Sequence, residues 1–340
     1  MGIKHKIIFS VHAGKKAGYG HLARNLALAE VFIDESYECK FIIKSDAPES
    51  VYDFLNIRTV YNIATKLFDT SSSNQQELDL IQYEFQKGPS FLILDHYGHD
   101  EIFRSQLKNM GIRWAQFDYK KTERIIADAV INSNIGVSQN DYIHLVEKNA
   151  LLCVGEKYAI IRKELLKYNH DPIPNRILIS MGGGEYPDKI QELIKLTVSD
   201  NSFHFEVVTN SIQLIEGIGQ NNNVSIHNNP LNIGEIYSRC EAGIVAGGVT
   251  TYELAYIGVP MIMIPFVKNQ ADNAKAWDFR NFGINFEHPE YYKANMNSVG
   301  FKQILENLFK HFASKSSIID GHGASNISKS IINYIQNGKH

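Results

Sequence analysis

Residues 243–264 read GIVAGGVTTYELAYIGVPMIMI, and this stretch indicates the fold of the second half of the chain. An apolar run from Gly243 to Ala246 ends in two glycines, a helix-forming run follows, and Val259-Pro260 lead into a second apolar run. Strand, glycine turn, helix and strand in this order are typical of a parallel sheet covered by helices. Glycines before a helix free backbone N–H groups to bind an anion at the helix N-terminus. The stretch therefore predicts an α/β domain with a phosphate-binding turn at Gly247 and Gly248.

Polar residues follow this turn, and two interpretations of Glu253 stay open. Thr250 and Glu253 have the spacing of a capping box, in which each side chain satisfies a backbone N–H at the helix start. Alternatively, Glu253 holds the hydroxyl groups of a ribose, with Thr250 and Thr251 beside the phosphates. Asn269 and Gln270 come after the next strand, at its carboxyl end, where amide side chains can contact phosphate or sugar.

The same alternation of apolar runs and amphipathic stretches continues through the chain. We expect strands near residues 6–11, 39–44, 91–95, 113–117, 129–131, 177–181, 203–208, 243–245 and 261–264, and helices near 21–34, 101–110, 188–198 and 251–257. The segment YNHDPIPN, residues 168–175, holds two prolines and no periodicity, so we place a domain boundary there. The fold class expected is α/β, with two Rossmann-like parallel-sheet domains, 1–170 and 171–340, facing a cleft. Ligands of such sheets bind outside the carboxyl ends of the strands.

Composition limits the function to small-molecule chemistry. A chain of 340 residues exceeds what one hydrophobic core usually serves, and 44% hydrophobic with 21% charged residues is typical of globular proteins. A net charge of −3 gives no basic surface for nucleic acid. The three cysteines form no C-x-x-C pair, and the apolar run at Ile7–Phe9 is too short for a signal peptide or a membrane span. We therefore expect a cytoplasmic protein without a membrane span, and a monomer is compatible with the sequence.

The first strand leads into a glycine turn with Gly18, Gly20 and His21 at the start of a helix. Gly18, Gly20 and Ala23 match the dinucleotide pattern G-x-G-x-x-A, but the first glycine lies too far beyond the strand for that fold, so no cofactor is expected. A helix N-terminus disfavours an imidazolium, so His21 can be a neutral general base. The other interpretation is that His21 caps the helix or packs against it.

Two further strand ends carry candidate site residues. Gly182, Gly183 and Gly184 follow the strand at 177–181, where they either let a ligand approach the backbone or form a plain flexible turn. The residues Asp95-His96-Tyr97-Gly98-His99-Asp100 follow the strand at 91–95. His96 and His99 could bind a metal, but Gly98 between them disfavours the helical arrangement that would make the two ligands converge. We expect instead that Asp95 and Tyr97 orient a polar substrate and that no metal is bound.

Several motifs give the chain a resemblance that extends over nearly its whole length. They are GYGHLAR at 18–24, Asp95-x-Tyr97-x-x-Asp100, GEKYAIIR at 155–162, SMGGGEYPD at 180–188, AGGVTTYELAYIGVPMIMIPFVKNQ at 246–270 and DGHGA at 320–324. In these motifs the chain resembles the UDP-2,4-diacetamido-2,4,6-trideoxy-beta-L-altropyranose hydrolases of pseudaminic acid biosynthesis and the relatives of a spore-coat polysaccharide protein. It resembles more distantly the glycosyltransferases of the B-type fold.

The resemblance implies that the two domains bind different parts of the substrate. The C-terminal domain would hold UDP, with the glycines at 182–184 and 247–248 and Thr250 around the pyrophosphate, Glu253 on the ribose, and Asn269 and Gln270 completing the phosphate side. The N-terminal domain would present the sugar, and the last helix could return to it. His21 would activate water for an inverting attack on the anomeric carbon, without a metal.

The chain departs from the family in its first loop, SVHAGKK at 10–16, which lacks the usual arginine, and near Phe117-Asp118, where one aspartate replaces a pair. These departures bear on the identity of the sugar. A glycosyltransferase that uses the same nucleotide-sugar site is the rival function, because water and an acceptor hydroxyl need the same base. A non-catalytic nucleotide-sugar-binding protein would keep the C-terminal loops and have no use for His21.

Overall fold

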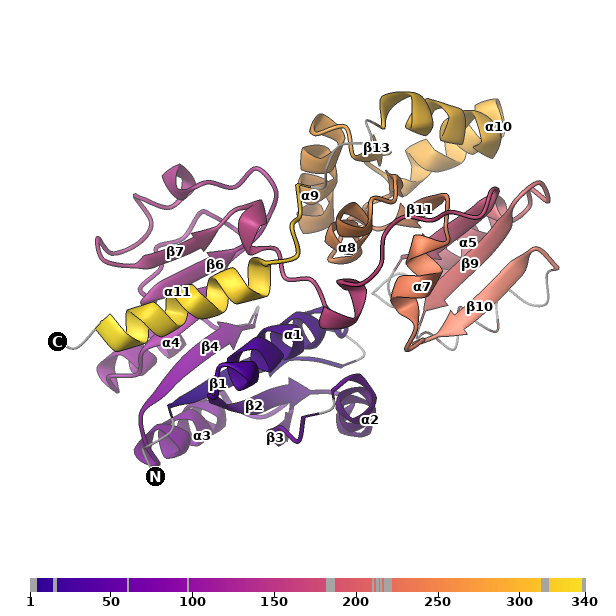
Figure 1. The fold of residues 1–340 in the computed structure, drawn as a ribbon. Helices are drawn as coiled ribbons and strands as arrows, with labels where there is room; N and C mark the ends of the chain where they lie inside the picture. Colours follow the sequence, from indigo (N-terminus) through magenta and orange to yellow (C-terminus); the bar gives the residue numbers. More distant parts are fainter. Residues whose placement is uncertain are drawn as a thin grey trace. The chain divides into compact units, whose positions relative to one another are not determined.

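The computed structural model of the chain describes residues 5–14, 17–59, 61–96, 98–181, 187–209, 211, 214, 216, 222–312 and 318–337. It forms two compact units (Figure 1). Unit 1 comprises Met1–Ile161 and Gly321–His340, and unit 2 comprises Arg162–Asp320. Each unit contains a parallel sheet with helices packed on it, which confirms the predicted fold class.

Unit 1 is built on a seven-stranded sheet in the order β3-β2-β1-β4-β5-β6-β7. Its strands are β1 (Lys6–His12), β2 (Glu38–Ser45), β3 (Ala64–Asp69), β4 (Ser90–Asp95), β5 (Trp114–Phe117), β6 (Ala129–Asn132) and β7 (Leu151–Val154). Its helices are α1 (Gly20–Asp34), α2 (Pro48–Arg58), α3 (Asn74–Gln86), α4 (Glu101–Asn109) and α11 (Gly323–Asn337). The strand order reverses between β1 and β4, which makes their carboxyl ends the switch point of the sheet.

Helices cover both faces of this sheet because its strands are apolar on both faces. Ile7, Phe9 and Val11 of β1 belong to a core with residues of α1, α2 and α11. Ile8 and Leu92 belong to a second core with residues of α3 and α4. Successive side chains of a strand point to opposite faces, so these two cores identify which face each residue of β1 and β4 serves.

Unit 2 contains a six-stranded sheet in the order β10-β9-β8-β11-β12-β13. Its strands are β8 (Arg176–Ser180), β9 (His204–Thr209), β10 (Val224–Asn228), β11 (Ala242–Val245), β12 (Met261–Met263) and β13 (Gly283–Asn285). Its helices are α5 (Pro187–Thr197), α7 (Ile233–Ser238), α8 (Thr250–Ile257), α9 (Lys268–Phe279) and α10 (Pro289–His311). The glycine turn at residues 247–248 connects β11 to α8.

The bounds of the units differ from the expected division at residues 170 and 171. The segment at 168–175 is bonded to unit 2, since the backbone N–H groups of His170, Asp171 and Ile173 donate to carbonyls of Ile257, Ser238 and Arg239. The division therefore precedes Arg162. The terminal helix α11 lies with unit 1, because Ala324, Ile327 and Ile331 enter the core that contains β1 and α1. Long-range hydrogen bonds decide where unit 2 begins, and proline content alone does not reveal this bound.

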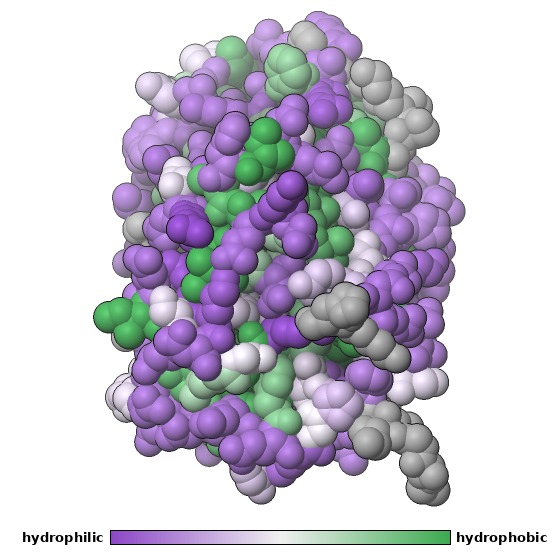
Figure 2. Space-filling model, turned by 90° about the vertical axis from the view of Figure 1, so that its left-hand side faces the viewer, coloured by the Kyte–Doolittle hydropathy of each residue, from purple (hydrophilic) through white to green (hydrophobic). Residues whose placement is uncertain are grey.

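Figure 2 shows one face of the molecule, on which hydrophilic residues predominate and hydrophobic ones gather in separate patches. Such patches are normal, because over half of the accessible surface of a folded protein is apolar. Among the helices in the described parts of the chain, none combines the length and the apolar character that crossing a membrane requires.

Candidate active site

The switch point of the sheet in unit 1 carries a buried polar network. β1 and β4 are neighbours in register, with Val11 opposite Asp95, and α1 follows β1 through the glycine turn. Gly14 and Gly18 exchange backbone hydrogen bonds of 3.3 and 2.9 Å, and Gly18 has a φ of +72°. The N–H of Gly18 is therefore bonded within the turn, and this bond helps to fix the conformation of the chain before α1. Gly20 is the first residue of that helix.

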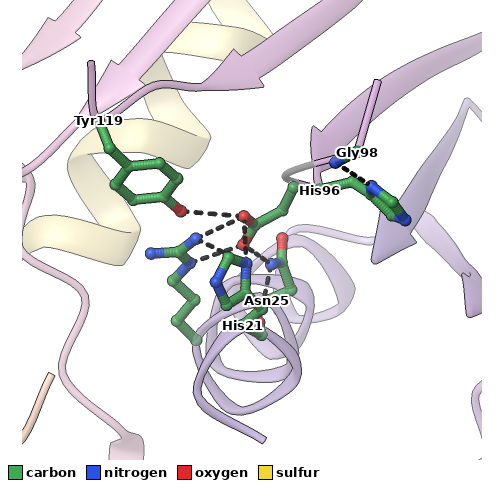
Figure 3. A network of polar contacts seen from close by, with 7 residues as sticks. His21, Asn25, His96, Gly98 and Tyr119 are labelled. Atoms are coloured by element: carbon green, nitrogen blue, oxygen red, sulfur yellow. Dashed lines mark hydrogen bonds and ion pairs between the residues drawn. The ribbon is translucent and has the colours of Figure 1, made fainter. Parts of the chain in front are cut away.

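His21 lies against Asp95 at this point, and Figure 3 shows His21 and Asn25 on one helix within a network of polar contacts that Tyr119 also joins. The distance from His21 Nδ1 to Asp95 Oδ1 is 2.7 Å, His21 is 8% exposed and Asp95 is fully buried. An ionised carboxylate only accepts hydrogen bonds, which assigns the proton of the neutral imidazole to Nδ1. The lone pair then lies on Nε2, which is the arrangement of a general base oriented by a carboxylate.

Three further side chains donate to Asp95. Arg24 Nε donates to Oδ2 at 2.6 Å and Tyr119 Oη to Oδ1 at 3.0 Å. Arg24 Nη2 also pairs with Oδ1, and Asn25 Nδ2 donates to Oδ2. Burial alone would raise the pKa of Asp95, but the positive charge of Arg24, with His21, outweighs it and holds this pKa below its usual range. Asp95 is thus an ionised group held against His21, and the expectation that it orients a polar substrate stays a prediction.

Helix α1 explains why His21, Arg24 and Asn25 meet one carboxylate. Residues three and four apart share a face of a helix, so these three side chains point together toward β4. The guanidinium of Arg24 also lies over the rings of Phe117 and Tyr119, at 4.3 and 5.0 Å from their centres. The sequence interpretation gave Asn25 and Tyr119 no role. Asn25 could have been identified from its spacing of four residues from His21 on the helix. Tyr119 could have been identified from its position just beyond the end of a strand.

The rest of the segment after β4 serves other purposes. Tyr97, predicted to be catalytic, lies outside the described residues. Asp100 caps α4, since its Oδ1 accepts from the N–H of Phe103 at 2.8 Å. His99 contacts the carboxylate of Glu77 at 2.9 Å. These contacts separate His99 and Asp100 from the network around His21.

The glycine turn of unit 2 has the geometry of an anion-binding loop. Gly247 has a φ of +89°, and a Cβ atom there would lie 2.8 Å from the backbone oxygen of Gln270, so only glycine fits. A Cβ at Gly248 would meet no protein atom within 4 Å, which leaves this backbone open to a ligand. The start of α8, at Val249 and Thr250, has no side-chain cap. Uncapped N–H groups beside an open glycine attract phosphate.

Asn269 and Gln270 occupy the first turn of α9, and Gln270 lies next to Gly247. Asn269 is exposed, and α9 also begins without a side-chain cap. Gln270 Oε1 accepts from the N–H of Phe266 at 3.0 Å and so helps to hold the loop before the helix. The structure thus brings the predicted residues of the two loops together at one end of the sheet of unit 2. Gly182, Gly183 and Gly184 lie outside the described residues.

Glu253 does not form the expected capping box but pairs with an arginine, and its contact with a ribose stays a prediction. Its carboxylate forms a two-bond ion pair with Arg162, at 2.7 Å from Nε and 2.9 Å from Nη2, and the residue is 4% exposed. Burial alone would lower the pKa of Arg162, and the charge of Glu253 more than offsets this and raises it. The missing side-chain cap on α8 argues against the capping box. Thr251, predicted to lie by the phosphates, donates from Oγ1 to the backbone oxygen of Gly248 at 2.7 Å.

Known proteins share this architecture and parts of the sequence. The family described as UDP-glucoronosyl and UDP-glucosyl transferase matches residues 239–320, which include both loops. The UDP-2,4-diacetamido-2,4,6-trideoxy-beta-L-altropyranose hydrolase of Campylobacter jejuni is 22% identical over 295 residues, 83% of this chain and 100% of that protein. Protein MJ1062 of Methanocaldococcus jannaschii is 25% identical over 279 residues, 76% of this chain; the match covers 55% of that protein, so the chain spans about half of its length.

Solved structures share the fold at low sequence identity. The UDP-GlcNAc 2-epimerase of Neisseria meningitidis, bound to UDP-GlcNAc, superposes with a TM-score of 0.64 and 12% identity, covering 96% of this chain and 100% of that one. The calicheamicin glycosyltransferase CalG4 superposes with a TM-score of 0.59 and 12% identity over 100% of both chains.

These similarities first define a class: the chain has the B-type glycosyltransferase fold and is related to enzymes that process nucleotide sugars. More narrowly, it is related to the UDP-2,4-diacetamido-2,4,6-trideoxy-beta-L-altropyranose hydrolase family, which confirms the resemblance predicted from its motifs.

Proposed function

We propose that this protein hydrolyses a UDP-linked 2,4-diacetamido-2,4,6-trideoxy sugar to the free sugar and UDP. The observation that carries the proposal is the contact of 2.7 Å between His21 Nδ1 and the buried carboxylate of Asp95. A neutral imidazole fixed in this way presents Nε2 as a base, and the relationship to the Campylobacter jejuni hydrolase supports water as the group that it activates.

In the proposed reaction, Nε2 of His21 takes a proton from water while the water oxygen attacks the anomeric carbon. The bond between that carbon and the phosphate oxygen breaks, UDP leaves with the electron pair, and the configuration at the carbon inverts. Asp95 stabilises the imidazolium that forms. The uncapped starts of α8 and α9 and the open backbone at Gly248 would stabilise the charge on the diphosphate, so no step requires a metal.

The decisive assay measures UDP release from UDP-2,4-diacetamido-2,4,6-trideoxy-altropyranose in the absence of any acceptor and in the presence of EDTA. We expect stoichiometric UDP and free sugar, with UDP-GlcNAc as a poorer substrate. UDP release that depends on an added sugar or peptide acceptor would assign the transferase reaction instead. Binding without turnover under both conditions would leave a nucleotide-sugar-binding protein. The cytoplasmic location and the role in pseudaminic-acid-type biosynthesis stay predictions.

Replacing Gly248 by alanine tests the nucleotide site. The added methyl group meets no protein atom within 4 Å, so we expect an unchanged melting temperature. The methyl group would keep the diphosphate away from the backbone N–H groups and so remove a hydrogen bond. A hydrogen bond to a charged group contributes about 1.5–3 kcal/mol. Calorimetry should therefore show UDP affinity at least about tenfold lower.

Gly247→Ala is the matched comparison, because it should lower both stability and affinity through its clash with the carbonyl of Gln270. Unchanged UDP affinity in a stable Gly248→Ala protein would show that the diphosphate does not bind at this turn.

A further inference from the structure

A second polar cluster lies at the same strand ends as His21 and Asp95, on the opposite face of the sheet. Ser10 lies on the same face of β1 as Ile8, which packs with α3 and α4. Asp95 lies on the same face of β4 as Ile93, which packs with α1 on the other side of the sheet. Glu77 of α3 reaches this second face, where Ser10 Oγ donates to its carboxylate. His96 and His99 follow β4 and complete the cluster.

Glu77 is a buried carboxyl group whose partners are Ser10 and His99. It is fully buried, its Oε2 lies 2.9 Å from Nε2 of His99, and within the described residues it forms no ion pair with lysine or arginine. Glu84 lies about two helical turns further along the same face of α3 and is 3% exposed. It contacts Lys6, Lys40 and Lys87. A buried charge is costly unless a counter-charge is present. Glu77 therefore has serine and histidine as its partners, where Glu84 has three lysines.

The two histidines present ring nitrogens that the protein leaves without a bond. His96 Nε2 and His99 Nδ1 are buried and have no hydrogen-bond partner in the described structure. The rings stack at 4.1 Å with an angle of 29° between them. A neutral imidazole is the form that binds a metal.

We propose that Glu77, His96 and His99 bind one divalent transition-metal ion, with Zn²⁺ as the best fit. One carboxylate oxygen and two imidazole nitrogens lie within 4.8 Å of one another. Ligand atoms about 2.0–2.2 Å from a tetrahedral zinc ion lie about 3.4 Å apart, so the side chains would have to turn and move closer together to bind it. Imidazole and carboxylate ligands suit zinc, and a set with two nitrogens disfavours Mg²⁺ and Ca²⁺.

Binding of the ion would change some of the contacts around the three side chains. Lone pairs of imidazole lie in the ring plane, so the ion would turn His96 and His99 out of their stack. Because His96 Nδ1 accepts from the N–H of Gly98 at 2.8 Å, the neutral ring carries its proton on Nε2 and its lone pair on Nδ1, so the ion would replace this bond at Nδ1. Ser10 would keep the Glu77 carboxylate oriented as an outer-shell donor. The ion would place a positive charge beside the Glu77 carboxylate and would fix the chain just after Asp95.

The experiment uses the full-length protein after EDTA treatment and dialysis. We expect calorimetry to show saturable binding of one Zn²⁺ per chain, Co²⁺ to give the strong visible bands of four-coordinate cobalt, and Zn²⁺ to raise the melting temperature. Glu77→Gln and the double variant His96→Asn/His99→Asn should weaken binding at least about 10–100-fold. Glu84→Gln, the same change on the same helix, should leave the affinity for Zn²⁺ as it is in the wild type.

Equal affinity in wild type and Glu77→Gln would overturn the proposal, as would the lack of saturable binding. Should the variants not fold, X-ray absorption of the zinc-loaded wild type decides alone. Two imidazole nitrogens with oxygen support the site, whereas a sulfur or all-oxygen shell contradicts it. Because these readouts measure binding and stability, they are independent of the proposed hydrolysis.

Discussion

Replacing His21 by asparagine is expected to lower kcat by at least about 10²-fold, because general-base catalysis contributes about 10²–10⁴-fold. The imidazole Nε2, which the contact to Asp95 leaves as the acceptor, is the group that is lost. UDP affinity should stay close to that of the wild type, since we assign the nucleotide to the glycine turn of unit 2. Steady-state rates of UDP release and calorimetric titration with UDP measure the two effects separately.

The competing interpretation of His21 is structural. The N-cap of α1 is Tyr19, and no side chain caps this helix start, so the structure gives His21 no capping role. A purely structural His21 would yield a variant that melts earlier and turns over normally per folded molecule. His144→Asn, the same substitution at an exposed histidine, serves as the matched control and should leave both kcat and melting temperature unchanged.

Replacing Asp95 by asparagine should have two large effects with a common cause. The amide can donate to Nδ1 of His21, which would favour the wrong tautomer and protonate Nε2, so we expect kcat to fall by about 10²–10⁴-fold. The guanidinium of Arg24 would also lose its anion, and breaking a buried ion pair costs about 3–5 kcal/mol. Denaturant unfolding and UDP release, measured on one variant, test both.

The pH dependence of unfolding checks the second effect. The pKa of Asp95 in the folded protein lies below its usual range, so the unfolded chain binds the proton more readily. This stabilisation is present above the unfolded value of about 3.9 and is lost as the pH falls through the folded pKa. The stability gap between wild type and Asp95→Asn should therefore narrow as the pH falls below about 4.

Tyr119→Phe is the control for Asp95→Asn, because it removes one donor to Asp95 and keeps the contact with His21. It should lower kcat much less than Asp95→Asn. A rate in Asp95→Asn close to that of the wild type would refute the positioning role of this carboxylate.

The sequence by itself determined the two α/β sheets and the position of the main loops. Apolar runs such as 177–181 and 261–264 and the glycines at 247–248 are local signals, because they reflect the pleat, the helix period and backbone conformation. His21 was found in the same way, from its place at the start of a helix. Edge strands such as β3 and β13 and the helices α2, α3, α9 and α10 were not predicted, because their apolar pattern is weak or mixed with polar residues.

Tertiary structure alone decided which side chains meet. His21 and Asp95 lie 74 positions apart in sequence, and Arg162 and Glu253 lie 91 apart. For Glu253, the local capping-box spacing pointed to Thr250, and the fold instead supplied a buried arginine. Glu77, His96 and His99 meet only because β1 and β4 are neighbours at the switch point and α3 and α4 cover the same face. Such pairings depend on the order of the strands and on the face of the sheet that each residue occupies. The spacing of residues along the sequence does not reveal either of these.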